Sequence, residues 1–345
     1  FTLAKEIFNK NFKIEILSSK LEYGEKKIIT KKLANNEIDI IFGTHAIFQK
    51  KIVFKKLGLI IIDEQHKFGV NQRKKLSDKG GDNCDVLLMS ATPIPRTLTM
   101  TIYGDMDLSI IKEKPKLRKE VITYSKLESK VDEVMRFITK EINSDNQVFW
   151  VCPLIEESKK IDHTSAIKKY EFLCKKFPNQ VALLHGKTEI TEKEIILNKF
   201  LKNEFKILVS TTIIEVGIDF PNANVIIIEN ANKFGLSQLH QLRGRVGRGS
   251  KQSSCILMFK SSLTENAKKR LNILKNSTDG FEISEEDMKL RGFGDILGFK
   301  QSGVKIFKLA DPIHNSDLFK LAEKEIKLME KNDTNIAKYK TLMKL

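Results

Sequence analysis

Short continuous apolar runs alternate along the chain with longer amphipathic stretches. Apolar runs of about four to eight residues between polar segments are typical of strands in a parallel sheet, and apolar positions three and four apart predict covering helices. The runs predict strands at 14–17, 38–42, 57–62, 86–89, 121–124, 147–151, 181–184, 207–209, 225–228 and 254–259. The amphipathic stretches predict helices that include 130–142 and 165–177. We therefore expect an α/β fold with parallel sheets and helical crossovers.

This pattern predicts two RecA-like lobes followed by a helical region. The expected segments are 1–113 for an incomplete first lobe, 114–119 for a hinge, 120–260 for the second lobe, 261–310 for a helical hairpin with a loop, and 311–345 for a C-terminal helical tail. The hinge is polar, carries a proline and lacks periodicity. In the hairpin, helices at 263–275 and 284–290 should flank a turn at 278–281. The glycine-rich stretch at 292–303 should be an extended loop, and a last helix is expected at 317–331.

The apolar run at 57–62 ends directly in Asp63, Glu64, Gln65 and His66. A strand buried on both faces would deliver the two carboxylates to its carboxyl-terminal edge, where open α/β sheets bind ligands. An aspartate there can hold Mg²⁺ through its water shell, and the next carboxylate can orient or deprotonate an attacking water. The pattern is that of a Walker-B site, although an ordinary solvated strand end would also carry these residues.

Three further polar motifs follow predicted strands in a fixed order. They are 90–96 (Ser-Ala-Thr-Pro-Ile-Pro-Arg), 210–219 (Ser-Thr-Thr-Ile-Ile-Glu-Val-Gly-Ile-Asp) and 241–249, which fits Gln-x-x-Gly-Arg-x-x-Arg. Together with 63–66 they resemble motifs II, III, V and VI of superfamily 2 helicases. Four ordered matches in one chain are difficult to obtain by chance.

The resemblance narrows to one bacterial family, the RecG branch-migration helicases. The segments that carry it are 43–49, 63–73, 150–157 and 239–245. Residues 270–303 resemble the translocation motif that RecG shares with the transcription-repair coupling factor Mfd. His66, Gly249 and the tail segment 307–311 favour RecG over Mfd, which is the alternative within the class.

The resemblance implies ATP and Mg²⁺ as cofactors and assigns a role to each matching residue. Asp63 would hold Mg²⁺ through water, Glu64 would orient the hydrolytic water, and Arg245 and Arg248 would complete the catalytic set. The residues that would contact the nucleotide are Gln241, Gly217, Asp219 and His66. Those that would couple the nucleotide state to DNA movement are Gln65, Ser90, Thr92, Arg96, Arg270, Arg291 and Gln301. Those that would contact DNA are Thr44, His45, His185, Gly186, Thr211 and Thr212.

Several of these roles have structural alternatives. His66 could be a buried, hydrogen-bonded histidine, and the Ser-Ala-Thr-Pro sequence at 90–93 could be a plain turn before a helix. The arginines of 241–249 could bind DNA phosphates alone.

No Gly-x-x-x-x-Gly-Lys-[Ser/Thr] phosphate loop occurs in the sequence. Such a loop supplies the amides and the lysine that hold the β and γ phosphates, so we expect that this chain alone does not form a whole ATP site. The chain begins at Phe1 on an amphipathic stretch that would follow the phosphate loop in RecG. We expect that loop in an upstream part of a longer protein. A natural paralogue without the loop is the alternative.

The formal net charge of +16 on 345 residues favours a polyanionic partner, although a lysine-rich proteome would give the same excess. Only nine of the 60 cationic residues are arginines, and seven of these lie in the motifs above. Arginine gives a planar, bidentate donor fork that lysine lacks, so its concentration there indicates specific contacts. Arg118 and Arg136 lie outside the motifs and are interpreted as surface residues.

The expected function is the motor portion of an ATP-dependent, double-stranded-DNA translocase. By resemblance, its substrates are stalled forks and Holliday junctions, and single-stranded-DNA-binding protein is a further partner. No stretch of 18 or more apolar residues and no secretion signal is present, and the four cysteines form no Cys-x-x-Cys pair. We therefore expect a protein that neither spans a membrane nor is secreted, with its cysteines as reduced thiols. The resemblance implies a monomer in the bacterial cytoplasm. A non-hydrolysing DNA-binding module is the alternative from another class.

Overall fold

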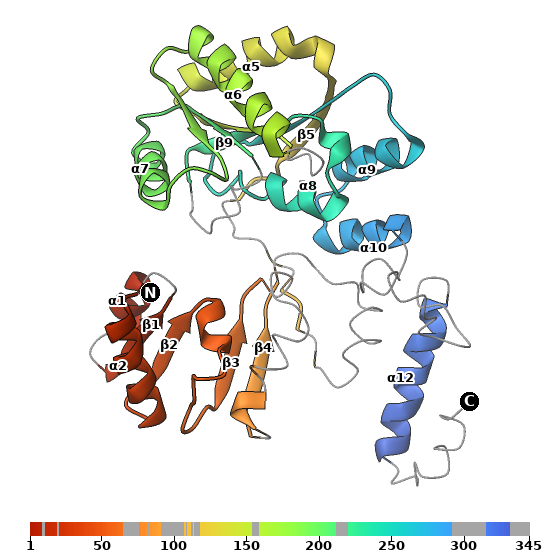
Figure 1. Ribbon diagram of the computed structural model, residues 1–345. Helices are drawn as coiled ribbons and strands as arrows, with labels where there is room; N and C mark the ends of the chain where they lie inside the picture. Colours follow the sequence, from red (N-terminus) through yellow and green to blue (C-terminus); the bar gives the residue numbers. More distant parts are fainter. Residues whose placement is uncertain are drawn as a thin grey trace. The chain divides into compact units, whose positions relative to one another are not determined.

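The structure is a computed structural model (Figure 1). It describes residues 1–8, 11–18, 21–64, 76, 78–81, 83–90, 107, 109–111, 113, 118–153, 159–211, 220–291 and 315–331. The chain divides into two compact units, Phe1–Ala91 and Thr92–Leu345. Parallel strands and helices build both units, which confirms the α/β class expected from the sequence. The five segments expected from the sequence stay a prediction.

The first unit contains two pairs of parallel strands. Its strands are β1 (Ile14–Leu17), β2 (Ile40–Gly43), β3 (Leu59–Ile62) and β4 (Asp85–Leu88), and its helices include α1 (Thr2–Phe8), α2 (Tyr23–Ala34) and the 3-10 helix η2 (His45–Phe48). β1 pairs with β2, and β3 pairs with β4. All four strands lie within two residues of the positions that the apolar runs predicted.

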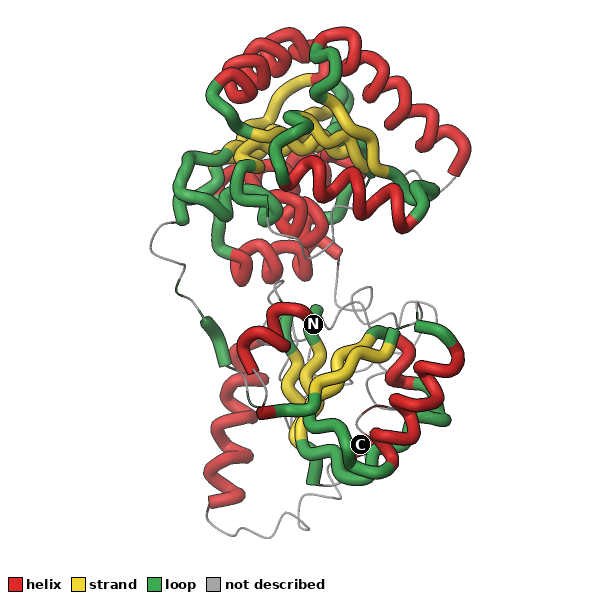
Figure 2. The backbone as a smooth tube through the Cα atoms, turned by 90° about the vertical axis from the view of Figure 1, so that its left-hand side faces the viewer, coloured by secondary structure: helices red, strands yellow, loops and turns green. Residues whose placement is uncertain are grey.

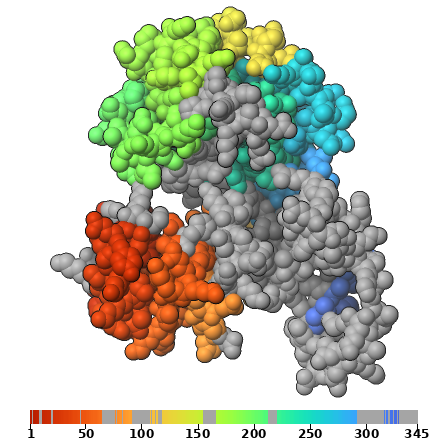
Figure 3. Space-filling model, in the orientation of Figure 1, coloured from red at the N-terminus to blue at the C-terminus, as the bar shows by residue number. Residues whose placement is uncertain are grey.

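The expectation that β3 is buried on both faces is wrong. Ile60 and Ile62 are buried, but Leu59 is 53% exposed and Ile61 is 56% exposed. Side chains alternate between the two faces of a strand, and the apolar cluster around β3, which includes Leu76, covers only one of them. The sequence pattern could not distinguish a strand covered on both faces from one covered on a single face. The surface of this unit is red to orange in Figure 3.

The second unit is a six-stranded parallel sheet in the order β5-β10-β9-β6-β8-β7. Its strands are β5 (Ile122–Leu127), β6 (Gln147–Val151), β7 (Val181–Leu184), β8 (Ile207–Ser210), β9 (Ala223–Ile228) and β10 (Ser254–Phe259). Its helices include α5 (Val131–Asn143), α6 (Lys159–Lys176), α7 (Ile190–Leu201), α8 (Leu236–Arg243), α9 (Glu265–Asn276), α10 (Gly280–Arg291) and α12 (Ser316–Lys331), with short 3-10 turns η4 (Glu128–Lys130) and η6 (Ala231–Lys233). This sheet agrees with the strands expected at 121–259.

Helices cover both faces of this sheet (Figure 2). Val148 and Trp150 of β6 pack with side chains of α5 and α6. The alternate residues of the same strand, Phe149 and Val151, pack with side chains of α7, α8 and α9 on the other face. Every residue of β6 is therefore buried, as the continuous apolar run predicted.

The helical hairpin after the sheet differs from its expected form at the turn. α10 begins at Gly280, so the predicted assignment of Gly280 and Phe281 to the turn is wrong. The Asp279 carboxylate accepts a hydrogen bond from the amide of Phe281 at 2.8 Å and satisfies a donor in the first turn of the helix. The expected helix at 317–331 is found as α12. The glycine-rich stretch and residues 114–117 of the expected hinge lie outside the described residues.

All four cysteines are free thiols, in agreement with the expectation from their spacing. Among the helices that the structure describes, none has the length and apolar character needed to cross a membrane.

Candidate functional site

Asp63 and Glu64 follow β3 directly, as the Walker-B interpretation requires. The Asp63 side chain is exposed, and its Oδ1 accepts a hydrogen bond from the amide of Glu64 at 2.9 Å. A carboxylate has acceptor capacity beyond this one contact, which suits a Mg²⁺ ion held through water. Glu64 has a φ of 48°, a left-handed conformation that non-glycine residues rarely adopt and that often occurs at functional sites. The residues present therefore fit the metal that the resemblance implies.

Ser90 lies at the same sheet edge as Asp63. Ile62 and Leu88 are partners in the parallel pair β3–β4, and the amide of Met89 still donates to the carbonyl of Ile62 at 2.8 Å. The structure thus brings motif II and the start of motif III together. Gln65, His66, Thr92 and Arg96 lie outside the described residues.

The predicted DNA contact at Thr44 and His45 lies at the carboxyl end of β2. Thr44 is exposed and precedes η2, and its carbonyl accepts from the amide of Ile47 at 3.1 Å. A Cβ atom on Gly43 would lie 2.2 Å from the side chain of Ile47 and 2.9 Å from the carbonyl oxygen of Leu17. Only glycine allows this close approach between the end of β2 and η2. The side chain of His45 lies outside the description.

In the second unit, His185 and Thr211 lie side by side. They follow β7 and β8, whose last residues, Leu184 and Ser210, are register partners. The amide of Lys187 donates to His185 Nδ1 at 3.2 Å, so the neutral imidazole carries its proton on Nε2. The amide of His185 donates to the Thr188 hydroxyl at 3.0 Å. Two amides of this turn are therefore used within it, which the sequence did not predict.

Thr211 is 4% exposed, so little of its side chain is accessible at this strand end. Its hydroxyl and that of Ser210 have no hydrogen-bond partner among the described residues. A buried hydroxyl without a partner costs about 1–3 kcal/mol. Thr212, Gly217 and Asp219 of motif V lie outside the described residues.

Motif VI begins on α8 and continues beyond it. Gln241 and Arg245 are half-buried, and Arg248 is exposed. Between the two arginines, Gly247 has a φ of 78°, and a Cβ atom there would lie 2.9 Å from the side chain of Val121. The glycine therefore permits the sharp turn that sets the position of Arg248.

Arg243 is a residue whose role the sequence analysis missed. It is 4% exposed, and its Nη1 donates to the carbonyls of Leu274 at 2.7 Å and Ser277 at 2.8 Å. Its Nη2 lies 3.0 Å from His240 Nδ1, and burial lowers the pKa of the guanidinium. Arg243 ties α8 to the end of α9 and is committed to this role. The signal in the sequence was its helical spacing from the buried Leu236 and Leu239.

Arg243→Met is expected to destabilise the second unit by at least about 2 kcal/mol, because two carbonyls lose a charged donor in a buried place. Denaturant unfolding followed by the fluorescence of Trp150, in the core of this unit, measures the change. Arg136→Met, at an exposed position of α5, is the control and should leave the midpoint unchanged. Equal midpoints for the two variants would contradict the structural role of Arg243.

Arg270 of α9 also links the two helices, through hydrogen bonds to the residues just before α8. Its Nη1 donates to the carbonyl of Phe234 and its Nη2 to the carbonyl of Asn232, both at 3.0 Å. Ser237 of α8 also donates to the carboxylate of Asp287 on α10. The hairpin α9–α10 is thus attached to the motif VI helix at several points (Figure 1). The side chain of Arg291, the last residue of α10, and all of Gln301 lie outside the description.

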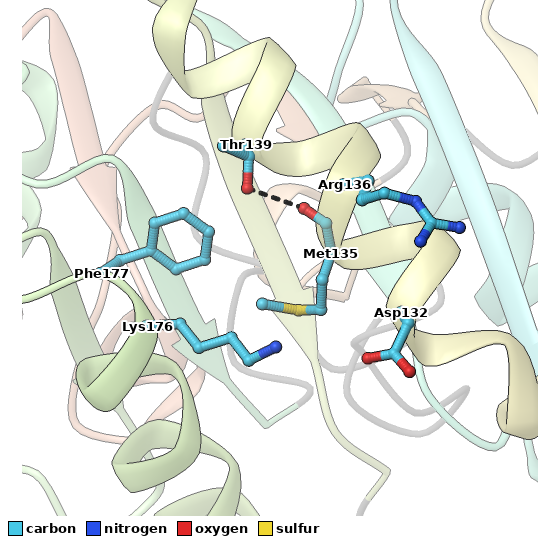
Figure 4. Close-up of a pocket in the computed structure, with 6 residues that line it drawn as sticks. All are labelled: Asp132, Met135, Arg136, Thr139, Lys176 and Phe177. Atoms are coloured by element: carbon cyan, nitrogen blue, oxygen red, sulfur yellow. Dashed lines mark hydrogen bonds between the residues drawn. The ribbon is translucent and has the colours of Figure 1, made fainter.

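Arg118 and Arg136 are both exposed, as expected. A pocket of about 460 Å³ lies between α5 and the end of α6, lined by Asp132, Met135, Arg136, Thr139, Lys176 and Phe177 (Figure 4). It contains none of the motif residues. Arg118 lines a smaller pocket of about 70 Å³ together with His240 and Arg243 of α8. Arg136 is therefore the better control residue for motif VI.

The fold and the strand-end motifs define a superfamily 2 helicase. The DEAD/DEAH box helicase family matches residues 2–101, the helicase conserved C-terminal domain matches 129–250, and the RecG domain 3 C-terminal family matches 277–343. The Lhr helicase of Mycobacterium smegmatis, at 14% identity, a TM-score of 0.54, and coverage of 75% of this chain and 36% of that chain, shares the fold alone.

More similar proteins identify the family. The ATP-dependent DNA helicase RecG of Bacillus subtilis is 49% identical over 304 residues, which are 88% of this chain and 44% of that protein. RecG of Aquifex aeolicus is 47% identical over 339 residues, 96% of this chain and 43% of that protein. A solved RecG bound to a three-way DNA junction is 42% identical, with a TM-score of 0.68 and coverage of 92% of this chain and 41% of that chain. The chain belongs to the RecG family and spans less than half the length of these relatives.

Proposed function

We propose that this chain provides motor lobes of an ATP-dependent helicase that translocates on double-stranded DNA and acts on branched substrates. The position of Asp63 and Glu64 at the carboxyl end of β3 is the observation that carries the proposal. The similarity to a RecG solved on a three-way junction supports branched DNA as the substrate. The same similarity favours RecG over the coupling factor Mfd.

In this proposal, Asp63 would hold Mg²⁺ through water, and Glu64 would orient the attacking water. Bound MgATP would supply the phosphoryl group whose transfer to water drives the motor. Arg245 and Arg248 offset charge that develops on the phosphates, and Gln241, His66, Gly217 and Asp219 contact the nucleotide. In the alternative, the arginines of 241–249 bind DNA phosphates and not the nucleotide. Arg243 is buried and donates to two carbonyls, so only Arg245 and Arg248 would be left for that role.

The proposed DNA contacts are Thr44, His45, His185, Gly186, Thr211 and Thr212. Thr44, His185 and Thr211 each follow the carboxyl end of a parallel strand. Contacts from strand ends to phosphates would position DNA without reading its sequence. The residues that would couple these contacts to the nucleotide are Gln65, Ser90, Thr92 and Arg96. Motion of the lobes would be transmitted to the duplex by Arg270, Arg291 and Gln301.

The wider setting of the protein is also a proposal. The relatives are bacterial, which supports a place in the cytoplasm of a bacterium. We further propose that the motor works as a monomer and meets single-stranded-DNA-binding protein at forks.

The role of the motif VI arginines can be tested in a chain extended with the remaining residues of the Bacillus subtilis relative. Arg245→Lys or Arg248→Lys should lower DNA-stimulated ATPase by at least about tenfold, because lysine keeps the charge but lacks the bidentate fork. Arg136→Lys, on the exposed face of α5, should be nearly silent. If lysine is tolerated equally at all three positions, these arginines supply charge alone.

A further inference from the structure

Lys79 connects two parts of the first unit that are far apart in the sequence. Its Nζ donates to the carbonyl of Gln49 at 2.8 Å and to the carbonyl of Ile52. These two carbonyls belong to the turn directly after η2, in which the amide of Ile52 donates to Gln49 at 3.0 Å. Partial burial of Lys79 lowers the pKa of its amine, because the ammonium is less well solvated there.

Residues 76 and 78–80, around Lys79, are helical, and they also touch the strand that carries the carboxylates. Leu76, three residues before Lys79, is buried in a cluster with Ile60 and Ile62 of β3. Residues three apart lie on one face of a helical segment. This face therefore places Leu76 against β3 and Lys79 against the turn that follows η2. The segment therefore bridges the strand of Asp63 and the loop of Thr44.

Packing within η2 completes the connection. Ile47 contacts both the cluster around Leu17 and Ile52 and the cluster around Ile60 and Ile62. η2 thus fills the space between the two strand pairs. Lys79 holds the turn after η2, and the close approach at Gly43 holds the residues before it. The Thr44 loop therefore has little freedom to move relative to β3.

We propose that Lys79 is a positioning residue that fixes the Thr44–His45 loop to β3, so that DNA contact at the loop and the carboxylates at the strand end move as one body. The DNA part of this inference rests on the proposed function. The positional part rests on the hydrogen bonds and packing alone. No step of it depends on bound nucleotide.

The test compares Lys79→Met with Lys55→Met in the 345-residue chain, because Lys55 is exposed in the same unit and its loss removes the same charge. Hydrogen–deuterium exchange at 45–52 should become at least about tenfold faster in Lys79→Met and stay unchanged in Lys55→Met. Affinity for a short duplex should fall about fivefold for Lys79→Met and less than about twofold for Lys55→Met, with equal change in salt dependence.

Lys79→Arg keeps the donors and should restore both the slow exchange and the affinity. Unchanged exchange in Lys79→Met, or equal weakening of duplex binding by the Lys79 and Lys55 variants, would overturn the proposal. If Lys79→Met fails to fold, Lys79→Gln enters the same comparison, because its shorter, neutral side chain cannot span to both carbonyls, and parental exchange in that variant would overturn the proposal. If the parent chain binds no duplex, the proposed DNA contact fails, while the exchange at 45–52 still decides the role of Lys79.

Discussion

The 345-residue chain by itself is expected to show no DNA-stimulated ATP hydrolysis. The affinity of such motors for MgATP comes mainly from the amides, lysine and hydroxyl of a phosphate loop, and the sequence contains no such motif. Asp63 and Glu64 supply carboxylates at the end of β3, and Arg245 and Arg248 supply cations, but no residues of this pattern hold the β and γ phosphates. A coupled ATPase assay with and without duplex DNA measures the result.

The same chain should still bind duplex DNA weakly, with an affinity that falls steeply as salt rises, because the charge of +16 remains. Adding an upstream segment with a phosphate loop should produce DNA-stimulated hydrolysis. Glu64→Gln in that extended chain should lower the rate again by about a hundredfold or more, since it removes the carboxylate that is proposed to orient the attacking water. Robust hydrolysis by the unextended chain would place the nucleotide site elsewhere. An extended chain that binds DNA without hydrolysis would favour the inert DNA-binding module.

Arg270→Ala in the extended chain is expected to abolish unwinding of a branched substrate and to leave much of the ATPase activity. Its guanidinium holds the carbonyls of Asn232 and Phe234, directly before the helix that carries Gln241. Without these contacts the hairpin should no longer follow motif VI, so hydrolysis continues while the motion is not passed to DNA. Arg291→Ala, at the other end of the hairpin, should behave in the same way.

Lys268→Ala is a matched control for Arg270, because Lys268 lies on the same helix, is exposed and forms an ion pair with Glu265 of that helix. ATPase and fork unwinding are measured on the same preparations, and the control should retain both activities. Parallel loss of hydrolysis and unwinding in Arg270→Ala would instead place this residue in the nucleotide site or in the core.

The sequence by itself determined the strands and the order of the motifs. A buried parallel strand needs a short continuous apolar run, and open α/β sheets bind ligands at the carboxyl ends of such strands. The strand and the polar motif after it are therefore both visible in a few consecutive residues. The runs before Asp63, Ser90 and Ser210 each became a strand, and the strands at 147–151, 181–184 and 254–259 appear with the predicted limits. Resemblance of the motifs added the family and the roles.

Tertiary structure decided which residues meet and which faces are covered. One face of β3 is exposed because nothing among the described residues packs against it. An apolar run in the sequence does not show which segments will pack against the strand. His185 and Thr211 are neighbours because β7 and β8 are adjacent in the sheet, and the strand order cannot be read from a single sequence. Arg243 looked like one cation of a phosphate-binding motif, yet it is buried and donates to two carbonyls. The motif could not reveal this, because the acceptors lie 31 and 34 residues away in the chain. Long-range hydrogen bonds of this kind, like that of Lys79 to Gln49, exist only once the fold brings the partners together.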